Sequence, residues 1–327
     1  MFWKPERPYY RVPGMLTVDT EGCPSVRLFG ILDRSRSTDA SRLASARPPH
    51  SGATNIGRVV GILEDSVATL DDCIQMLNQY SFSGAVSSST LDAKRAYLTP
   101  SRSLDAGKTL AFSSVSVGIE GLFEWLSMPP WQNDSGLNHD GDGLLISSTG
   151  IEPLELQLQD GTQLLLSSYG TAPTRLPSDA DITLSQDARL HIRPPEPCGL
   201  DTYTEIAQRF QNFLSLAVDR PVSITSLVGY SPQVISSAPE PRALPVDIFG
   251  RFPNPPRVGE SVNSNSMLFR QPAIAETLEA KLNAWWSMYD DARGPLSLYF
   301  AVTHDAYGNI EGNCWPLPKR RKAFIDS

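Results

Sequence analysis

Short apolar and β-branched runs separated by turn residues recur through the first 193 residues, and they constrain the fold more than any other feature. Runs such as NIGRVVGIL and KTLAFSSVSVG are bounded by Gly, Pro, Asp or Ser, and several alternate apolar and polar residues. The dipeptide Asp160-Gly161 separates two alternating runs, which predicts a hairpin because such a turn requires positive φ. Many strands at short intervals predict a mainly β member of the α+β class, an antiparallel β-sandwich or barrel-like domain with a few packed helices.

Three segments have helical periodicity instead. The run GIEGLFEWLSM predicts a short helix between Val117 and Met128, with Trp125 near its edge. Residues 200–218 carry apolar side chains at helical spacing, and Asp201 or Thr202 is expected to cap their helix. A third helix is predicted from Gln271 to Asp291, with Trp285 or Trp286 in the core and the other at a contact surface.

Composition along the chain predicts three regions. Residues 1–230 form a β-rich domain in which residues 33–55, rich in Ser, Arg, Ala and Pro, are a flexible insertion. Prolines are dense in residues 231–265, which predicts a linker or irregular segment. Residues 266–327 form a partial helical domain, because two prolines and the basic cluster KRRK at residues 319–322 replace the next expected helix. We therefore expect an exposed apolar face on the 271–292 helix, and self-association through it.

The bulk properties exclude several classes of protein. The chain has 327 residues, a formal net charge of −8 and no run of eighteen apolar residues, and its N-terminus carries charges and prolines where a secretory signal needs apolar residues. We expect a cytoplasmic protein without membrane contact. The net charge gives no overall attraction to phosphate backbones. Four scattered cysteines predict free thiols rather than a zinc or redox site: Cys23, Cys73, Cys198 and Cys314.

One acidic stretch resembles the opening of a calcium-binding loop. Oxygen ligands alternate before a glycine in Asn138, Asp140, Asp142 and Gly143. The twelfth position, Thr149, cannot supply the bidentate carboxylate that such a loop needs. A solvated turn is therefore predicted, with no metal site and no cofactor.

No catalytic motif is present. The sequence lacks a GxSxG elbow, a P-loop, HExxH and GxGxxG, and its four histidines are scattered: His50, His139, His191 and His304. A carboxylate pair for glycoside hydrolysis would leave no local pattern, and Trp125 and Trp131 could line a groove for sugar or peptide. A β-sandwich carbohydrate-binding or carbohydrate-active protein therefore stays open as an alternative.

The order of several segments resembles the N-terminal domain of the ApeA family of bacterial anti-phage proteins. The segments are YYRVPGMLTVDTEG, PSVRLFG, IGRVVGILEDSVATLDDC and FSSVSVGIEGLFEWL, followed by EIAQRFQNFLSLAVDRPVSITSL. The matching positions are Pro13, Gly14, Leu16, Gly61, Thr69, Leu70, Cys73, Leu122 and Trp125. The resemblance implies a sensing or regulatory region, triggered by a phage-derived protein, that precedes a helical HEPN ribonuclease domain in abortive infection.

HEPN ribonucleases of this kind commonly use an Arg-x4-His motif. The residues five before the histidines are Ser45, Asp134, Gln186 and Tyr299, so the motif is absent. We therefore expect residues 266–327 to be the stub of a truncated HEPN domain, the chain to have no catalytic residues, and RNA to be a partner only through the missing effector. A self-contained ribonuclease that uses unfamiliar residues remains a third possibility.

Overall fold

The computed structural model describes most of the chain, in residues 1–32, 53–79, 88–100, 109–137, 144–148, 151–171, 185–236, 240–251 and 262–305. Most of the predicted insertion at 33–55, the calcium-like turn at 138–143 and the KRRK cluster at 319–322 lie outside these residues. The described chain is mainly antiparallel sheet with a few helices, which confirms the predicted fold class.

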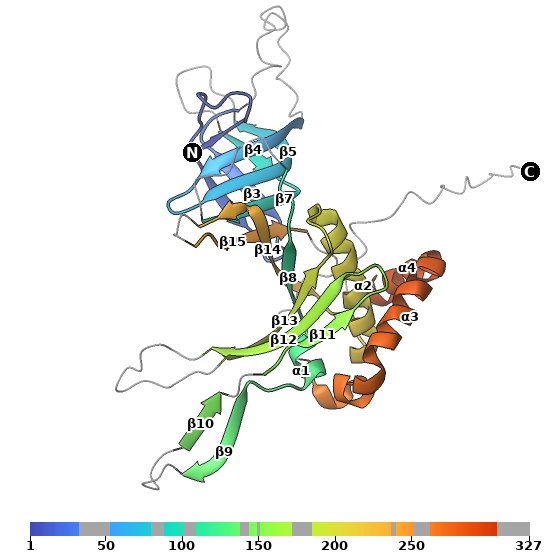
Figure 1. Ribbon diagram of the computed structural model, residues 1–327. Coiled ribbons are helices and arrows are strands. Elements are labelled where there is room, and N and C mark those ends of the chain that lie inside the picture. The colour runs from blue at the N-terminus through green and yellow to red at the C-terminus, as the bar shows by residue number, and fades with distance from the viewer. Residues whose placement is uncertain are drawn as a thin grey trace, which may run out of the picture.

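The N-terminal strands form a small barrel, drawn in blue in Figure 1. Its strands are β1 (Phe2–Trp3), β2 (Gly14–Val18), β3 (Pro24–Leu28), β4 (Thr54–Ile62), β5 (Val67–Gln79) and β6 (Ser88–Asp92). Each neighbour in the order β1-β4-β5-β6-β3-β2 pairs antiparallel. The backbones of Phe2 and Val12 exchange two hydrogen bonds of 2.7 Å just before β2, and this bridge closes the ring. Closure removes the free strand edges that would otherwise recruit other strands.

The sheet continues beyond the barrel into a second, helix-covered lobe. Its strands are β7 (Arg95–Thr99), β8 (Ser114–Ile119), β11 (Leu154–Gln157), β12 (Gln163–Thr171), β13 (Ser185–Arg193), β14 (Ile224–Ile235) and β15 (Ala243–Gly250). They follow the spatial order β5-β7-β15-β14-β8-β13-β12-β11. A separate hairpin of β9 (Trp131–Leu137) and β10 (Leu144–Ser148) projects from this lobe (Figure 1).

Helices cover this second lobe (Figure 1). They are α1 (Leu122–Leu126), α2 (Leu200–Val218), α3 (Leu278–Asp291) and α4 (Arg293–Asp305), with short 3-10 turns η2 (Ser264–Ser266) and η3 (Gln271–Thr277) before α3. The apolar side of α2 packs with Trp125, whose ring meets those of Phe210 and Phe213 edge-on at 6.2 and 6.1 Å.

Two main hydrophobic cores share the continuous sheet, beside a small third cluster of Trp3, Val60 and Val67. The barrel core is built from small and aliphatic residues around Phe2, and the larger core of the second lobe is rich in aromatic rings. On β7, Ala96 belongs to the barrel core and its neighbour Tyr97 to the larger one, because successive side chains of a strand point to opposite faces. One strand thus serves both cores.

Two local predictions are confirmed. Strands β11 and β12 form the predicted hairpin, and Gly161 in its loop has φ +86°. The N–H of Gly161 donates to the carbonyl of Leu158 at 3.0 Å, so a three-residue loop replaces the tighter two-residue turn. Helix α2 spans the predicted residues 200–218, but Gly199 caps it, whereas Asp201 bonds Arg95 of β7.

Two other predictions are wrong in part. The helix expected between Val117 and Met128 is limited to α1, because Val117 belongs to β8, and Trp125 is fully buried rather than at an edge. Within the predicted linker 231–265, β14 continues to Ile235 and residues 243–250 form β15. Pro245 is tolerated because it precedes the stretch of β15 that pairs with β7, where a proline would remove a needed donor.

The expected exposed apolar face on the 271–292 helix is also wrong. Leu278, Leu282 and Trp285 are buried in the larger core, and the indole N–H of Trp285 donates to the carbonyl of Arg209 on α2 at 3.0 Å. Trp285 is the core residue of the pair, while Trp286 is half-buried and packs against the same core, so a contact surface at Trp286 stays a prediction. The core continues across residue 265, although the division into three regions stays a prediction.

Candidate functional site

A cleft opens where the continuous sheet divides between the barrel and the second lobe. Strands β6 and β7 pair end to end along the same side of β5, and the break between them falls at Ala93 and Lys94. Strand β3 follows β6 into the barrel, with Ser25 opposite Asp92, whereas β15 follows β7 into the second lobe. Strands β3 and β15 diverge from this break, and the cleft opens between them.

A bend in β5 accompanies this division. Asp72 has φ +54°, and it lies between the part of β5 that pairs with β7 and the part that pairs with β6. A left-handed residue inside a strand marks a bulge that turns the strand. The carbonyl of the adjacent Asp71 accepts a hydrogen bond from the Lys94 N–H at 3.0 Å, which fixes the break against the bend.

Glycines hold the barrel close to the second lobe beside the cleft. Gly22 in the β2–β3 turn has φ +83°, and a Cβ atom there would lie 2.8 Å from the carbonyl oxygen of Gly250. Only glycine therefore fits both the backbone conformation and the close approach. The turn at the tip of β2 and β3 is thereby seated against the end of β15.

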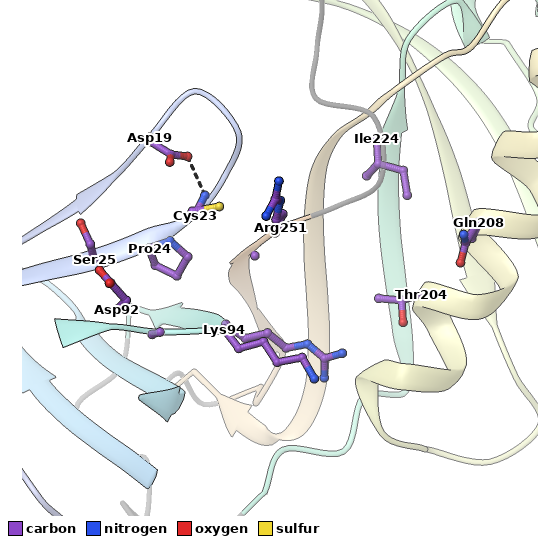
Figure 2. A pocket seen from close by; sticks show the side chains of 13 residues that line it. Asp19, Cys23, Pro24, Ser25, Asp92, Lys94, Thr204, Gln208, Ile224 and Arg251 are labelled. Carbon is purple, nitrogen blue, oxygen red and sulfur yellow. Dashed lines mark hydrogen bonds between the residues drawn. The ribbon is translucent and has the colours of Figure 1, made fainter. Parts of the chain in front are cut away.

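The cleft has a volume of about 660 Å³. Figure 2 shows its two walls, the β2–β3 turn and the β6–β7 break on one side and helix α2 on the other. The lining residues that the structure describes are mostly polar or charged: Asp19, Cys23, Pro24, Ser25, Asp92, Ala93, Lys94, Arg95, Thr204, Gln208, Ile224, Gly250 and Arg251. A cavity of this size is within the range that binds small ligands or part of a peptide.

Three cations of the lining pair with carboxylates of the same chain. Arg95 bonds Asp201 at the start of α2. Its guanidinium lowers the pKa of Asp201, first through the hydrogen bond and then through its charge. The ammonium of Lys94 lies 3.9 Å from a carboxylate oxygen of Asp72, and Arg251 lies 3.9 Å from Glu21, so these two ion pairs are loose.

The opposite wall holds Asp19 and Cys23. The Asp19 carboxylate accepts hydrogen bonds from the N–H groups of Glu21 and Cys23 at 2.9 and 2.8 Å, and it thereby shapes the turn. Burial, and secondarily the charge of Asp19, raises the pKa of the Cys23 thiol. Cys23 is therefore a protonated thiol at neutral pH rather than a reactive thiolate.

A family model described as ApeA N-terminal domain 1 matches residues 1–285, which is most of the chain. The chain belongs to this family. The match agrees with the resemblance to anti-phage proteins that the sequence motifs indicate, and it extends through η3 into the middle of α3. No curated protein and no solved structure matches the chain. The matched family is an N-terminal domain and not itself a catalytic HEPN domain.

Within this ApeA N-terminal domain, those residues singled out from the sequence that the structure describes do not come together in one site. His191 lies half-buried on β13, far along the chain from the other histidines, and its Nε2 atom lies 3.0 Å from the Ser167 hydroxyl. Burial, and then the charges of Arg189 and Arg193, lower the pKa of His191. In a nucleophilic site the histidine is oriented by a third group, most often a carboxylate, whereas the charged groups that act on His191 are the cations Arg189 and Arg193.

The cysteines and tryptophans singled out from the sequence do not form a site among the described residues. Cys73 is buried, Cys23 and Cys198 are half-buried, and all three are free thiols. Trp125 is fully buried and cannot line a groove, and the Trp131 side chain lies outside the described residues. Among the described residues, no three His, Cys, Asp or Glu side chains lie close enough to hold a metal ion.

The aromatic side chains expected at a carbohydrate site are not found in the cleft, because no aromatic residue is among its described lining.

No helix within the described part of the chain is long and apolar enough to cross a bilayer.

Sequence reasoning missed the cleft itself. Lys94 lies between β6 and β7 and Arg251 directly follows β15, so the two are remote in the sequence, and neither belongs to a motif. The dipeptide Lys94-Arg95 between two strand-like runs was the local signal available, but only the sheet topology places Arg251 on the same cleft.

Proposed function

We propose that this ApeA N-terminal domain is the sensing or regulatory module of an abortive-infection defence system. The observation that carries the proposal is the family match over residues 1–285, which covers both lobes and the cleft between them. A module that detects a partner needs an accessible surface with specific polar groups, and the cleft offers one. We propose that the module acts in the cytoplasm, where phage proteins are made.

The proposed trigger is a phage-derived protein, and RNA is a partner only through a HEPN ribonuclease of the kind that the family resemblance implies. The module itself is proposed to have no catalytic activity. The geometry that supports this is the Ser167–His191 pair, which is flanked by Arg189 and Arg193 instead of an acid. Self-association through residues 271–292 remains a prediction, and Met288 is the large apolar side chain of α3 that is exposed for it.

A domain-exchange experiment tests the sensing role. The chain is joined to the HEPN region of an ApeA protein in place of that protein's own N-terminal region, and bacteria that express it are challenged with a panel of phages. We expect protection against at least one phage, and none from the HEPN region alone. Equal plating of every phage on the two strains would contradict a sensing role.

Incubation of the purified chain with total RNA tests the absence of catalysis. We expect the RNA size distribution to remain unchanged, with and without added divalent cations. Cleavage that persists through stringent purification and is lost in the His191→Gln variant would overturn the non-enzymatic assignment.

A further inference from the structure

The lining of the cleft carries more cations than carboxylates, on a chain whose formal net charge is −8. Three of its lining residues are cations, Lys94 and Arg95 at the β6–β7 break and Arg251 at the end of β15. Figure 2 shows Lys94 reaching from the barrel side toward helix α2, with Arg251 above it at the end of β15. A ligand in the cleft therefore meets cations from two separate strands.

Two of these cations, Lys94 and Arg251, can exchange their present carboxylate partners for those of a ligand. The side chains of Lys94 and Arg251 are each 65% exposed, and their carboxylate partners Asp72 and Glu21 are 71% and 49% exposed. Exposed ion pairs contribute only about 0–1 kcal/mol, so an incoming carboxylate can replace Asp72 or Glu21 at little cost. Arg95 differs, because its side chain is only 25% exposed and its bond to Asp201 ties the barrel side of the cleft to α2.

The rest of the lining selects among anionic ligands. Nucleotides and single-stranded nucleic acids are usually held by stacking on aromatic side chains, and the described lining contains none. Asp19 and Asp92 line the same cleft, so its three cations exceed its carboxylates by only one. The cleft therefore suits a segment with a few spaced carboxylates better than a dense polyanion, which Asp19 and Asp92 repel more strongly. Inorganic phosphate is far smaller than a cavity of about 660 Å³. Polar groups of Ser25 and Gln208 on opposite walls are suited to the amides of a peptide backbone.

We propose that the cleft between the barrel and helix α2 binds an acidic protein segment, whose carboxylates replace Asp72 at Lys94 and Glu21 at Arg251. In taking this segment to be part of a phage trigger, the inference rests on the proposed sensing function. The binding itself depends only on the residues of the cleft. Arg95 keeps its bond to Asp201 and positions the wall against which the segment lies.

Peptide binding to the purified chain tests the proposal. Fluorescent peptides of about ten residues, which extend to about 33 Å, carry Glu and Asp between Gly and Ser in one set and Gln and Asn at the same positions in the other. We expect the acidic set to bind more tightly, and the Lys94→Glu/Arg251→Glu variant to weaken this binding about tenfold or more. Arg242→Glu is the matched control, because Arg242 is an exposed arginine paired with Glu240 at 3.5 Å outside the cleft.

The location of binding is measured by alkylation of Cys23. This thiol lines the cleft, so a bound acidic peptide should slow its modification, while Cys198 outside the described lining reacts at an unchanged rate. Equal binding of acidic and neutral peptides, or equal affinity in the cleft variant and the Arg242→Glu control, would overturn the proposal. So would tighter binding of ATP or an RNA oligonucleotide that depends on Lys94 and Arg251.

These outcomes separate the inference from the proposed function. The peptide assay contains no phage and no effector, so its failure leaves the sensing role to another surface. Failure of the domain exchange, with peptide binding intact, would instead leave a peptide-binding cleft without a defence role.

Discussion

The barrel and the helix-covered lobe protect their strand edges in different ways. The barrel closes on itself through the Phe2–Val12 bridge. The second lobe ends at β11, and helix α3 covers that edge with side chains: the N–H groups of Gln157 and Gln159 donate to Glu279 and Asn283 at 3.0 and 2.9 Å. A sheet edge thus needs hydrogen-bonding partners, and either a strand or the polar face of a helix supplies them.

The two cores also differ in how their interior space is filled. In the barrel, glycines let backbone approach rings closely, and a Cβ atom on Gly61 would lie 2.4 Å from the ring of Phe2. In the second lobe, large aromatic side chains such as Trp125 and Phe210 fill the space between sheet and helices. The barrel is therefore sensitive to added volume and the second lobe to lost volume, whereas the cleft between them carries polar residues that neither core uses.

Removal of Trp125 should have the largest effect. Trp125→Ala leaves a cavity between α1 and α2, and we expect it to lower the free energy of unfolding by about 3–5 kcal/mol in urea titrations. Trp125→Phe should cost much less, because it keeps the ring contacts and removes a buried N–H for which the described residues provide no acceptor. A loss below about 1 kcal/mol for the alanine variant would show that this core does not depend on ring volume.

Addition of volume to the barrel should rank second. Gly61→Val displaces Phe2 and with it the bridge to Val12, at a cost of about 1–3 kcal/mol. Hydrogen exchange should show faster exchange at the Val12 amide, with the protection of α2 retained. Gly294→Ala in α4 is the control, because no atom lies within 4 Å of the added Cβ there. Equal behaviour of the two glycine variants would contradict close packing in the barrel.

Uncovering the β11 edge should have a smaller effect. Asn283→Ala removes the bond from the Gln159 N–H and the bond to the Gln157 carbonyl, each worth about 1 kcal/mol. Faster amide exchange at Gln159 should follow. Lys281→Ala, which removes a hydrogen bond to Thr277 within the same helical segment, should leave the Gln159 amide protected. Unchanged exchange in the Asn283 variant would mean that α3 does not cover this edge.

The smallest expected effect is on the pH dependence of stability. The folded-state pKa of His191 lies below its unfolded value of about 6.5, so the unfolded chain binds more protons below that pH. Its contribution is fully present above about pH 6.5 and is lost as the pH falls toward the folded-state pKa. His191→Gln should therefore flatten the decline in urea midpoint between about pH 7 and about pH 5. An unchanged slope would show that His191 is not the group responsible.

Local pattern predicted those parts of the fold in which neighbouring residues decide the structure. The spacing of Ile206, Phe210 and Phe213 indicated α2 over its full length, and Asp160-Gly161 indicated the β11–β12 hairpin. The prolines of 231–265 were misleading, because Pro245 is acceptable in the part of β15 that lacks its second neighbour. Propensity alone does not reveal which side of a strand is paired.

The cleft could not be predicted from local sequence pattern, for a related reason. Lys94, Arg251 and Gln208 come together only because β3 and β15 diverge at the β6–β7 break and α2 lies across the gap. The burial of Leu278 and Leu282 likewise depends on α2, which the sequence of the 271–292 helix cannot show. Both features are products of pairing between distant segments.

The most direct test of the account is the protection that the chain confers when it replaces the N-terminal region of an ApeA protein. Phage plating is compared between the unaltered chain, its Lys94→Glu/Arg251→Glu variant and its Arg242→Glu variant, at equal protein levels. If the cleft receives the signal, protection is lost in the first variant and retained in the second. Equal protection by all three proteins would contradict the central claim.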